Sequence, residues 1–239
     1  MTDLVSGTAA ETGEIKKSAF KFVWLFYLVL GLFLIAVIAF ATFRPILVLP
    51  RITLAPGFSL TDQDGNRLTN EDMRGKMTLY NITHSTCSTP CPETGQIMKE
   101  VQERLKEIET GGIPVELITI SIDPEHDTPE VLLAYAESFD ADLDQWYFAT
   151  GPVDRLPWII GGGFGFYFNR SDDGQVLFDP GFILVDGLGI LRDEYRTATP
   201  DTDRILSDVD SIVNQVNNSD GANKVAYEAA HLIMCYPRG

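Results

Sequence analysis

Basic residues are scarce in this sequence, and their scarcity limits the partners that the chain can have. The 239 residues hold 18 Lys and Arg against 34 Asp and Glu, for a formal net charge of −16. Because a surface with this much negative charge repels phosphate backbones, we expect no nucleic-acid binding. It favours a basic protein partner instead, for example a basic cytochrome. The sequence also contains no internal repeat and no low-complexity tract.

Charge is missing altogether between residues 22 and 43, in the run FVWLFYLVLGLFLIAVIAFATF. As a helix rising about 1.5 Å per residue, this run spans the roughly 30 Å of a bilayer's hydrocarbon core. A cleaved signal peptide has a shorter apolar region that ends in small residues, whereas Arg44 and Pro45 follow here. We therefore predict one transmembrane helix that anchors the chain as a single-span membrane protein.

The charges that flank this run predict its orientation. Three lysines precede it, and Arg44 and Arg51 follow, so the positive-inside rule places the N-terminus in the cytoplasm. The first twenty residues lack Arg and contain acidic residues, which argues against a mitochondrial transit peptide and favours a bacterial source. We expect a single-pass protein of the cell inner membrane with its C-terminal domain on the periplasmic, oxidising side.

The sequence predicts five parts: a cytoplasmic segment (1–21), the transmembrane helix (22–43), an extended linker with three prolines (44–57), an α/β domain (58–216) and a tail (217–239). Within the domain, apolar patterning and turn residues predict strands at 77–83, 113–123, 146–151 and 163–168, and hairpins at 58–68 and 183–195. They also predict helices that follow Pro92, cover 128–139 and 153–160, and end the domain at 201–216. This order is typical of a thioredoxin-like fold, a central mixed sheet flanked by helices.

Two cysteines three residues apart lie where the strand 77–83 gives way to a helix. Cys91 is at the start of that helix, where the dipole and free N–H groups lower the pKa of a thiol. Two thiolates at this spacing can hold one cuprous ion, which prefers sulfur and imidazole ligands. The same sulfurs can instead form a disulfide and exchange it, with Cys87 attacking and Cys91 resolving. Both alternatives stay open at this point.

Four segments of the domain resemble the Sco/SenC family of membrane-anchored, thioredoxin-fold copper proteins: FSLTDQDGNRLTNEDMRGK, CSTPCP, ISIDPEHDTPEVLLAYA and WYFATG. The resemblance covers nearly the whole part of the chain beyond the membrane helix. It implies copper binding by Cys87 and Cys91. It also implies a role in delivering copper to, or reducing the thiols of, the dinuclear copper site of cytochrome oxidase.

One family feature is replaced in this chain. The resemblance implies a third copper ligand, a histidine, just before the next-to-last pair of strands, and that position falls at Phe178 in VLFDPGF. A phenyl ring cannot bind copper. His84, three residues before Cys87, is a candidate to fold back onto a metal held by the two sulfurs. His231 and Cys235, spaced i, i+4 in the tail, are another candidate pair, whereas we interpret His126 as a surface residue.

A proline in the same segment points toward redox chemistry. Pro180 precedes Asp186 by six residues, the spacing of the P-x-x-F-L-I-D segment in thioredoxin-like reductases, whose cis-proline faces the dithiol. We therefore predict that Pro180 is cis and lies beside Cys87 and Cys91. Three functions remain: a copper-binding factor that serves a respiratory oxidase, a thiol–disulfide oxidoreductase, or a non-catalytic accessory subunit of a quinol-oxidising or oxidase complex.

Overall fold

The computed structural model describes residues 11–43, 48–87, 91–171 and 176–218. It divides into two units, Met1–Leu47 and Val48–Gly239, which are considered separately. The first ten residues and the tail beyond residue 218, with His231 and Cys235, lie outside the described residues.

The first unit contains the helix α1 (Glu11–Phe43). Within the described residues, one stretch, Lys21–Ala39, is long and apolar enough to cross a membrane, with a mean hydropathy of 2.8. Its side chains are almost all exposed, including Phe22, Trp24 and Phe33. A contiguous exposed apolar surface of this length is typical of a segment that crosses a bilayer. The helix begins well before residue 22, where we expected the transmembrane segment to start.

The second unit is built on a mixed eight-stranded sheet with the strand order β1-β10-β9-β4-β5-β6-β2-β3. The strands β4, β5 and β6 are parallel, and the other pairings are antiparallel. Their bounds are β1 Thr53–Leu54, β2 Ser59–Asp62, β3 Arg67–Thr69, β4 Met77–Thr83, β5 Val115–Ser121, β6 Trp146–Thr150, β9 Phe182–Val185 and β10 Ile190–Tyr195. The predicted class, a mixed sheet flanked by helices, is confirmed.

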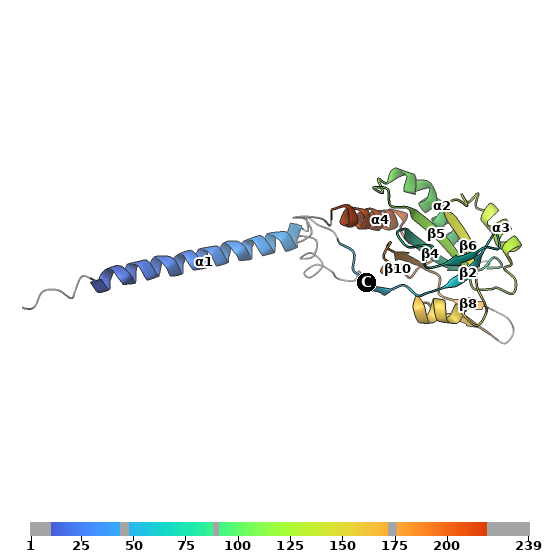
Figure 1. Cartoon of the computed structure of the whole chain (residues 1–239), viewed down its shortest axis with the longest axis horizontal. Coiled ribbons are helices and arrows are strands. Elements are labelled where there is room, and N and C mark those ends of the chain that lie inside the picture. The colour runs from blue at the N-terminus through green and yellow to red at the C-terminus, as the bar shows by residue number, and fades with distance from the viewer. Residues whose placement is uncertain (1–10, 44–47, 88–90, 172–175, 219–239) are drawn as a thin grey trace, which may run out of the picture. The chain divides into compact units, whose positions relative to one another are not determined.

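The two central strands are buried along their whole length because both faces of the sheet are covered. Figure 1 shows the helices α2 (Cys91–Arg104) and α4 (Thr202–Asn217) on one side of the sheet, and the core on that side also includes residues of α3 (Pro129–Glu137). Their apolar residues pack on Trp146 and Phe148. A short π-helix, η2 (Trp158–Gly163), covers the other face, and a 3₁₀ turn, η1 (Leu105–Glu107), follows α2.

The linker expected at 44–57 is only partly a linker. Val48 and Leu49 are buried, and the two residues of β1 pair with β10. The compact unit therefore starts at Val48 rather than near residue 58. Pro50 and Pro56, two of the three prolines that predicted an extended linker, instead flank a short edge strand, a position that tolerates their missing N–H groups.

The strand predicted at 163–168 is wrong for most of its length. The π-helix runs through Gly163, and Gly165 has a left-handed backbone (φ +72°) that interrupts extended structure. Phe164 and Phe166 are buried in the core instead of alternating along a strand. Extended structure begins only at β7 (Phe168–Arg170), which pairs with β8 (Val176–Phe178) in a separate two-stranded sheet.

Candidate functional site

The residues 84–91, here called the cysteine loop, connect β4 to α2. The backbone N–H of Cys87 donates to the carbonyl of His84 at 3.2 Å, so residues 84–87 form a turn directly after the strand. Cys87 is half-buried and disulfide-bonded. Cys91 is the first residue of α2, while residues 88–90 and the side chain of Cys91 lie outside the described residues.

A buried carboxylate holds the first part of the cysteine loop. Asp127, in the segment between β5 and α3, accepts the backbone N–H of Ser85 at 3.0 Å and the Ser85 hydroxyl. It also accepts the hydroxyl of Ser121 at the end of β5. The Asp127 side chain is buried, so these donors replace its lost water. Two segments 42 residues apart are thereby fixed to each other.

The charge of Asp127 is maintained by its neighbours. Burial alone raises the pKa of this carboxyl, but the hydrogen bonds from Ser121 and Ser85 outweigh burial, and the pKa is lower than that of an ordinary aspartate. The imidazole Nδ1 of His126 lies 3.1 Å from the Asp127 carboxylate, with its side chain half exposed. A negative charge therefore lies directly beneath the cysteine loop at neutral pH.

His84 is half-buried at the end of β4, and its ring contacts two side chains. Its Nδ1 lies 2.9 Å from the hydroxyl of Thr86. Its ring meets the ring of Phe178 edge to face, with centroids 5.7 Å apart and an interplanar angle of 69°. Burial lowers the pKa of His84 despite the opposing charges of Asp127 and Asp123. The imidazole is therefore neutral at pH 7, the form that ligates metals.

Phe178 and Pro180 come from the β7–β8 hairpin and the residues after it. Arg170, the last residue of β7, forms ion pairs with Asp123 and Glu125 in the segment after β5. These pairs hold the hairpin near the cysteine loop. Pro180 is half-buried, and its predicted cis bond and its predicted place beside the sulfurs stay predictions.

The structure thus brings Cys87 and His84 into one turn and places Phe178 against His84. Among the described residues, which exclude the Cys91 side chain, no group of three or more His, Cys, Asp or Glu is arranged to hold a metal ion. Sequence reasoning missed the roles of Asp127 and Arg170. Asp127 lies inside one of the segments that resemble the family, but nothing local indicates that its carboxylate holds a loop 42 residues earlier.

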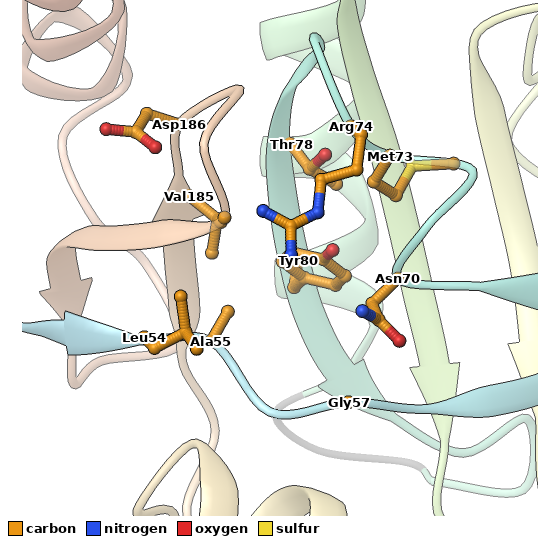
Figure 2. A pocket seen from close by; sticks show the side chains of 11 residues that line it. Leu54, Ala55, Gly57, Asn70, Met73, Arg74, Thr78, Tyr80, Val185 and Asp186 are labelled. Carbon is orange, nitrogen blue, oxygen red and sulfur yellow. The ribbon is translucent and has the colours of Figure 1, made fainter.

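A cavity of about 210 Å³ lies elsewhere in the domain. Figure 2 shows Leu54 and Ala55 on one side of this cavity, Arg74, Thr78 and Tyr80 on another, and Asp186 across from them. No residue of the cysteine loop lines it. Tyr80, the lining residue nearest to the end of β4, lies three residues before that end, roughly 10 Å of strand, so the cavity is separate from the candidate site.

Comparison with known proteins identifies the family. A family model described as SCO1/SenC matches residues 50–214. The SCO1 protein homolog of Bacillus subtilis (strain 168) is 29% identical over 157 residues, which cover 64% of this chain and 80% of that protein. The residues that the family model matches include the cysteine loop, the segment around Asp127 and the β7–β8 hairpin.

Solved structures agree with this result. One of them is the structure of BsSco, in which a disulfide switch was identified and which is a member of the Sco family of cytochrome c oxidase assembly proteins. It is 26% identical to this chain with a TM-score of 0.61, and the match covers 70% of this chain and 98% of BsSco. Copper-bound ScoI of Arabidopsis thaliana shares the fold at 23% identity, with a TM-score of 0.57 over 69% of this chain and 98% of its own. Because the family model matches well over half of the residues of this chain, the chain belongs to the SCO1/SenC family.

Proposed function

We propose that this chain is a membrane-anchored Sco-type protein that binds copper(I) through the dithiol of Cys87 and Cys91. It would serve the assembly or maintenance of a copper site in a respiratory oxidase. The observation that carries the proposal is the placement of Cys87: a disulfide-bonded sulfur in a turn that a buried carboxylate holds, four residues before the N-terminus of α2.

We infer that Cys91 is the disulfide partner of Cys87, because it is the nearest cysteine in the sequence and begins the adjacent helix. Two sulfurs that can close a bond can also converge on one ion after reduction. A dithiol reductant would supply the two electrons and two protons that open the disulfide. Binding of copper(I) then displaces the thiol protons, which the N-terminus of α2 favours by lowering a thiol pKa.

The donors in and beside the cysteine loop fit a cuprous cargo better than a hard ion. Thiolate sulfur and neutral imidazole are soft or borderline ligands, which copper(I) prefers. Among the described residues, the carboxylates nearest the loop already accept hydrogen bonds or ion pairs: Asp127 from Ser85 and Ser121, and Asp123 from Arg170. The copper that is bound in the Arabidopsis relative supports this reading.

The exposed apolar surface of α1 supports a single-span anchor. We propose that the N-terminus is cytoplasmic and that the domain faces the periplasm from the inner membrane, because the lysines precede the span. The net charge of −16 favours a basic partner, such as a basic cytochrome of the oxidase complex. Such an association weakens as the salt concentration rises, because ions screen exposed charges.

Thiol–disulfide exchange is a second function, favoured by the disulfide at Cys87. In this reaction, the Cys87 thiolate attacks a disulfide of a partner and forms a mixed disulfide while one partner thiolate leaves. The Cys91 thiolate then attacks the Cys87 sulfur, which releases the second partner thiolate. The partner gains two electrons, and the chain ends with its own disulfide closed. The disulfide switch described for BsSco is consistent with such chemistry.

Copper binding by the full chain in detergent tests the proposal. The chain is reduced with a dithiol, freed of reductant without oxygen, and titrated with copper(I) in competition with a chromophoric copper(I) chelator. We expect one tightly held copper ion per chain, loss of that ion in Cys87→Ser, and retention in the matched control Cys235→Ser. Absence of binding at micromolar free copper(I), or equal binding by Cys87→Ser, would falsify the copper function.

A reduction potential separates the two functions. If the potential of the Cys87 disulfide lies in the range of exchange enzymes, near −120 to −270 mV, exchange is supported. A potential below about −300 mV identifies a stable structural disulfide and removes the exchange reaction. Equilibration of the full chain with glutathione buffers, followed by thiol counting in wild type and Cys235→Ser, measures it.

A further inference from the structure

The cavity of about 210 Å³ has an exposed rim and a buried floor. Leu54 and Arg74 lie at the rim, since 65% of Leu54 and 48% of the Arg74 side chain are exposed. Thr78, Tyr80 and Val185 form the floor, and all three are buried. The volume is smaller than the roughly 300–1,000 Å³ of pockets that take drug-sized ligands, so the cavity suits a smaller molecule.

One buried hydroxyl on the floor is unpaired among the described residues. Thr78 is 1% exposed, and its Oγ1 forms no hydrogen bond within the described part of the chain. The hydroxyl of Tyr80 is a neighbour but is not placed to hydrogen-bond it. Leaving a buried hydroxyl unpaired is costly, and nearly all buried polar groups in folded proteins have a partner. A ligand in the cavity would supply the missing partner.

The groups that can bind such a ligand include several hydrogen-bond donors. Arg74 donates from Nη1 to the carbonyl of Leu188 at 2.6 Å, and its Nε lies 3.5 Å from the largely exposed carboxylate of Glu71. A guanidinium has five N–H donors, so others remain for a ligand. Burial raises the pKa of Tyr80, so its hydroxyl keeps its proton and can donate. Figure 2 shows the Arg74 side chain pointing from its loop toward the space between Tyr80 and Val185.

The carboxylate in the lining is already neutralised. Asp186 accepts from Arg192 at 2.9 Å and from two backbone N–H groups. Its charge therefore does not balance Arg74, and the exposed pair of Arg74 with Glu71 is weak. The cavity is thus locally positive in a chain whose net charge is −16. Much of the remaining lining is apolar: Leu54, Ala55, Met73 and Val185.

We propose that this cavity is a second ligand site, which takes a small organic carboxylate with a compact apolar body, about the size of benzoate. The carboxylate accepts from the Arg74 guanidinium, whose fork matches its two oxygens, and from the hydroxyls of Thr78 and Tyr80. The apolar body lies against Met73 and Val185, a surface that inorganic phosphate could not use. The inference is independent of the copper function, because no residue of the cysteine loop lines the cavity.

Titration of the full chain in detergent with benzoate and with its neutral isostere benzamide tests the site. The amide NMR signals of Thr78 and Gly189, which line the cavity, report binding there, and empty micelles provide the blank. We expect saturable shifts with benzoate and much weaker ones with benzamide. Arg74→Gln should weaken benzoate binding at least about tenfold, because a charge-assisted hydrogen bond is lost. The matched control Arg155→Gln, at an exposed arginine outside the cavity, should bind like wild type.

The unpaired hydroxyl provides a second readout, which a merely structural role would not produce. Thr78→Val keeps the shape of the side chain and should weaken benzoate binding about two- to tenfold. Without benzoate, its urea midpoint should equal or exceed that of wild type, because no hydrogen bond is lost. The matched control is Thr119→Val, at a buried hydroxyl that donates to Asn81 at 2.6 Å and accepts from Trp146 at 2.8 Å. This control should lower the midpoint.

Three results would contradict the proposal. If wild type shows no saturable shift with benzoate, the cavity is not a carboxylate site. If benzamide binds as tightly as benzoate, or Arg74→Gln binds benzoate like wild type, the guanidinium does not select an anion. If Thr78→Val lowers the urea midpoint as far as Thr119→Val does, the Thr78 hydroxyl stabilises the fold and is not held free for a ligand.

Discussion

The two ends of β4 carry polar networks of opposite character. Near its first residue lies the buried arginine network, in which Arg192 pairs with Asp186 at 2.9 Å and donates to Gln215 and to the carbonyls of Leu49 and Pro50. Asp127 lies beyond the last residue of β4, and its carboxylate accepts hydrogen bonds from two neutral hydroxyls and one backbone N–H.

The difference lies in how each network balances charge. Arg192 and Asp186 are both nearly inaccessible to water, at 2% and 5% exposure, and they neutralise each other. In the described part of the chain, the hydrogen-bond partners of Asp127 are two hydroxyls, one backbone N–H and the imidazole of the half-exposed His126, and none of them is a lysine or an arginine. One network therefore holds the domain together, and the other keeps a net negative charge under the loop that carries the cysteine.

Removing the arginine should have the largest effect. Arg192→Ala leaves Asp186 buried without its cation, which typically costs about 3–5 kcal/mol of unfolding free energy. It also releases residues 49–50 and α4, which the guanidinium joins to β10. Urea unfolding of the compact unit from Val48, followed by near-UV circular dichroism, measures the loss.

The exposed Arg155, paired with Asp154 on the surface, provides the matched control. Arg155→Ala should change the unfolding free energy by about 0.5 kcal/mol or less. A similar small change in Arg192→Ala would mean that the arginine network does not hold the domain together.

The end of β4 that carries Asp127 should respond less strongly, but with a distinct pH dependence. Asp127→Asn removes the charge that Ser85 and Ser121 stabilise, which should cost about 1.5–3 kcal/mol at pH 7. The folded-state pKa of Asp127 is lower than the unfolded value, so its contribution is present above the unfolded pKa near 4 and is lost as the pH falls through the folded pKa.

The difference in unfolding free energy between wild type and Asp127→Asn should therefore shrink as the pH decreases below about 4. Urea unfolding between pH 7 and pH 2 tests this. Asp140→Asn, at a carboxylate that is 88% exposed, is the isosteric control and should show no such convergence. A constant difference at all pH values would show that shape rather than charge holds the loop.

Features that depend on local contacts could be predicted from the sequence, whereas features that depend on contacts between distant segments could not. The strand 77–83 was predicted at its true bounds because every residue of β4 is buried and the run is mostly apolar. The last helix was predicted within one residue of its true bounds, and Asp201 caps it through a local contact, because its carboxylate accepts the nearby N–H of Asp203. The short strand β1 was not predicted, because it pairs with β10, which lies far along the chain.

For the site, the sequence located the residues of the cysteine loop but not their surroundings. Cys87 and His84 are neighbours in sequence, so their proximity in a turn was foreseeable. The contact between His84 and Phe178 joins two strands that are distant in the chain, and it depends on where the β7–β8 hairpin lies. No periodicity or turn signal encodes that position, which tertiary ion pairs of Arg170 support.

Loosening that hairpin should have the smallest effect on stability and a selective effect on the ring contact. Arg170→Ala removes partly exposed ion pairs to Asp123 and Glu125, which should cost about 1 kcal/mol or less. Because these pairs hold the hairpin near the cysteine loop, amide exchange in β7 and β8 should accelerate and the ring signals of His84 should shift. Arg67→Ala, which removes an exposed side chain of β3 that donates to Ser59, should change neither. Unchanged His84 signals in Arg170→Ala would mean that ring packing alone positions Phe178, and that the ion pairs are dispensable at this end of the molecule.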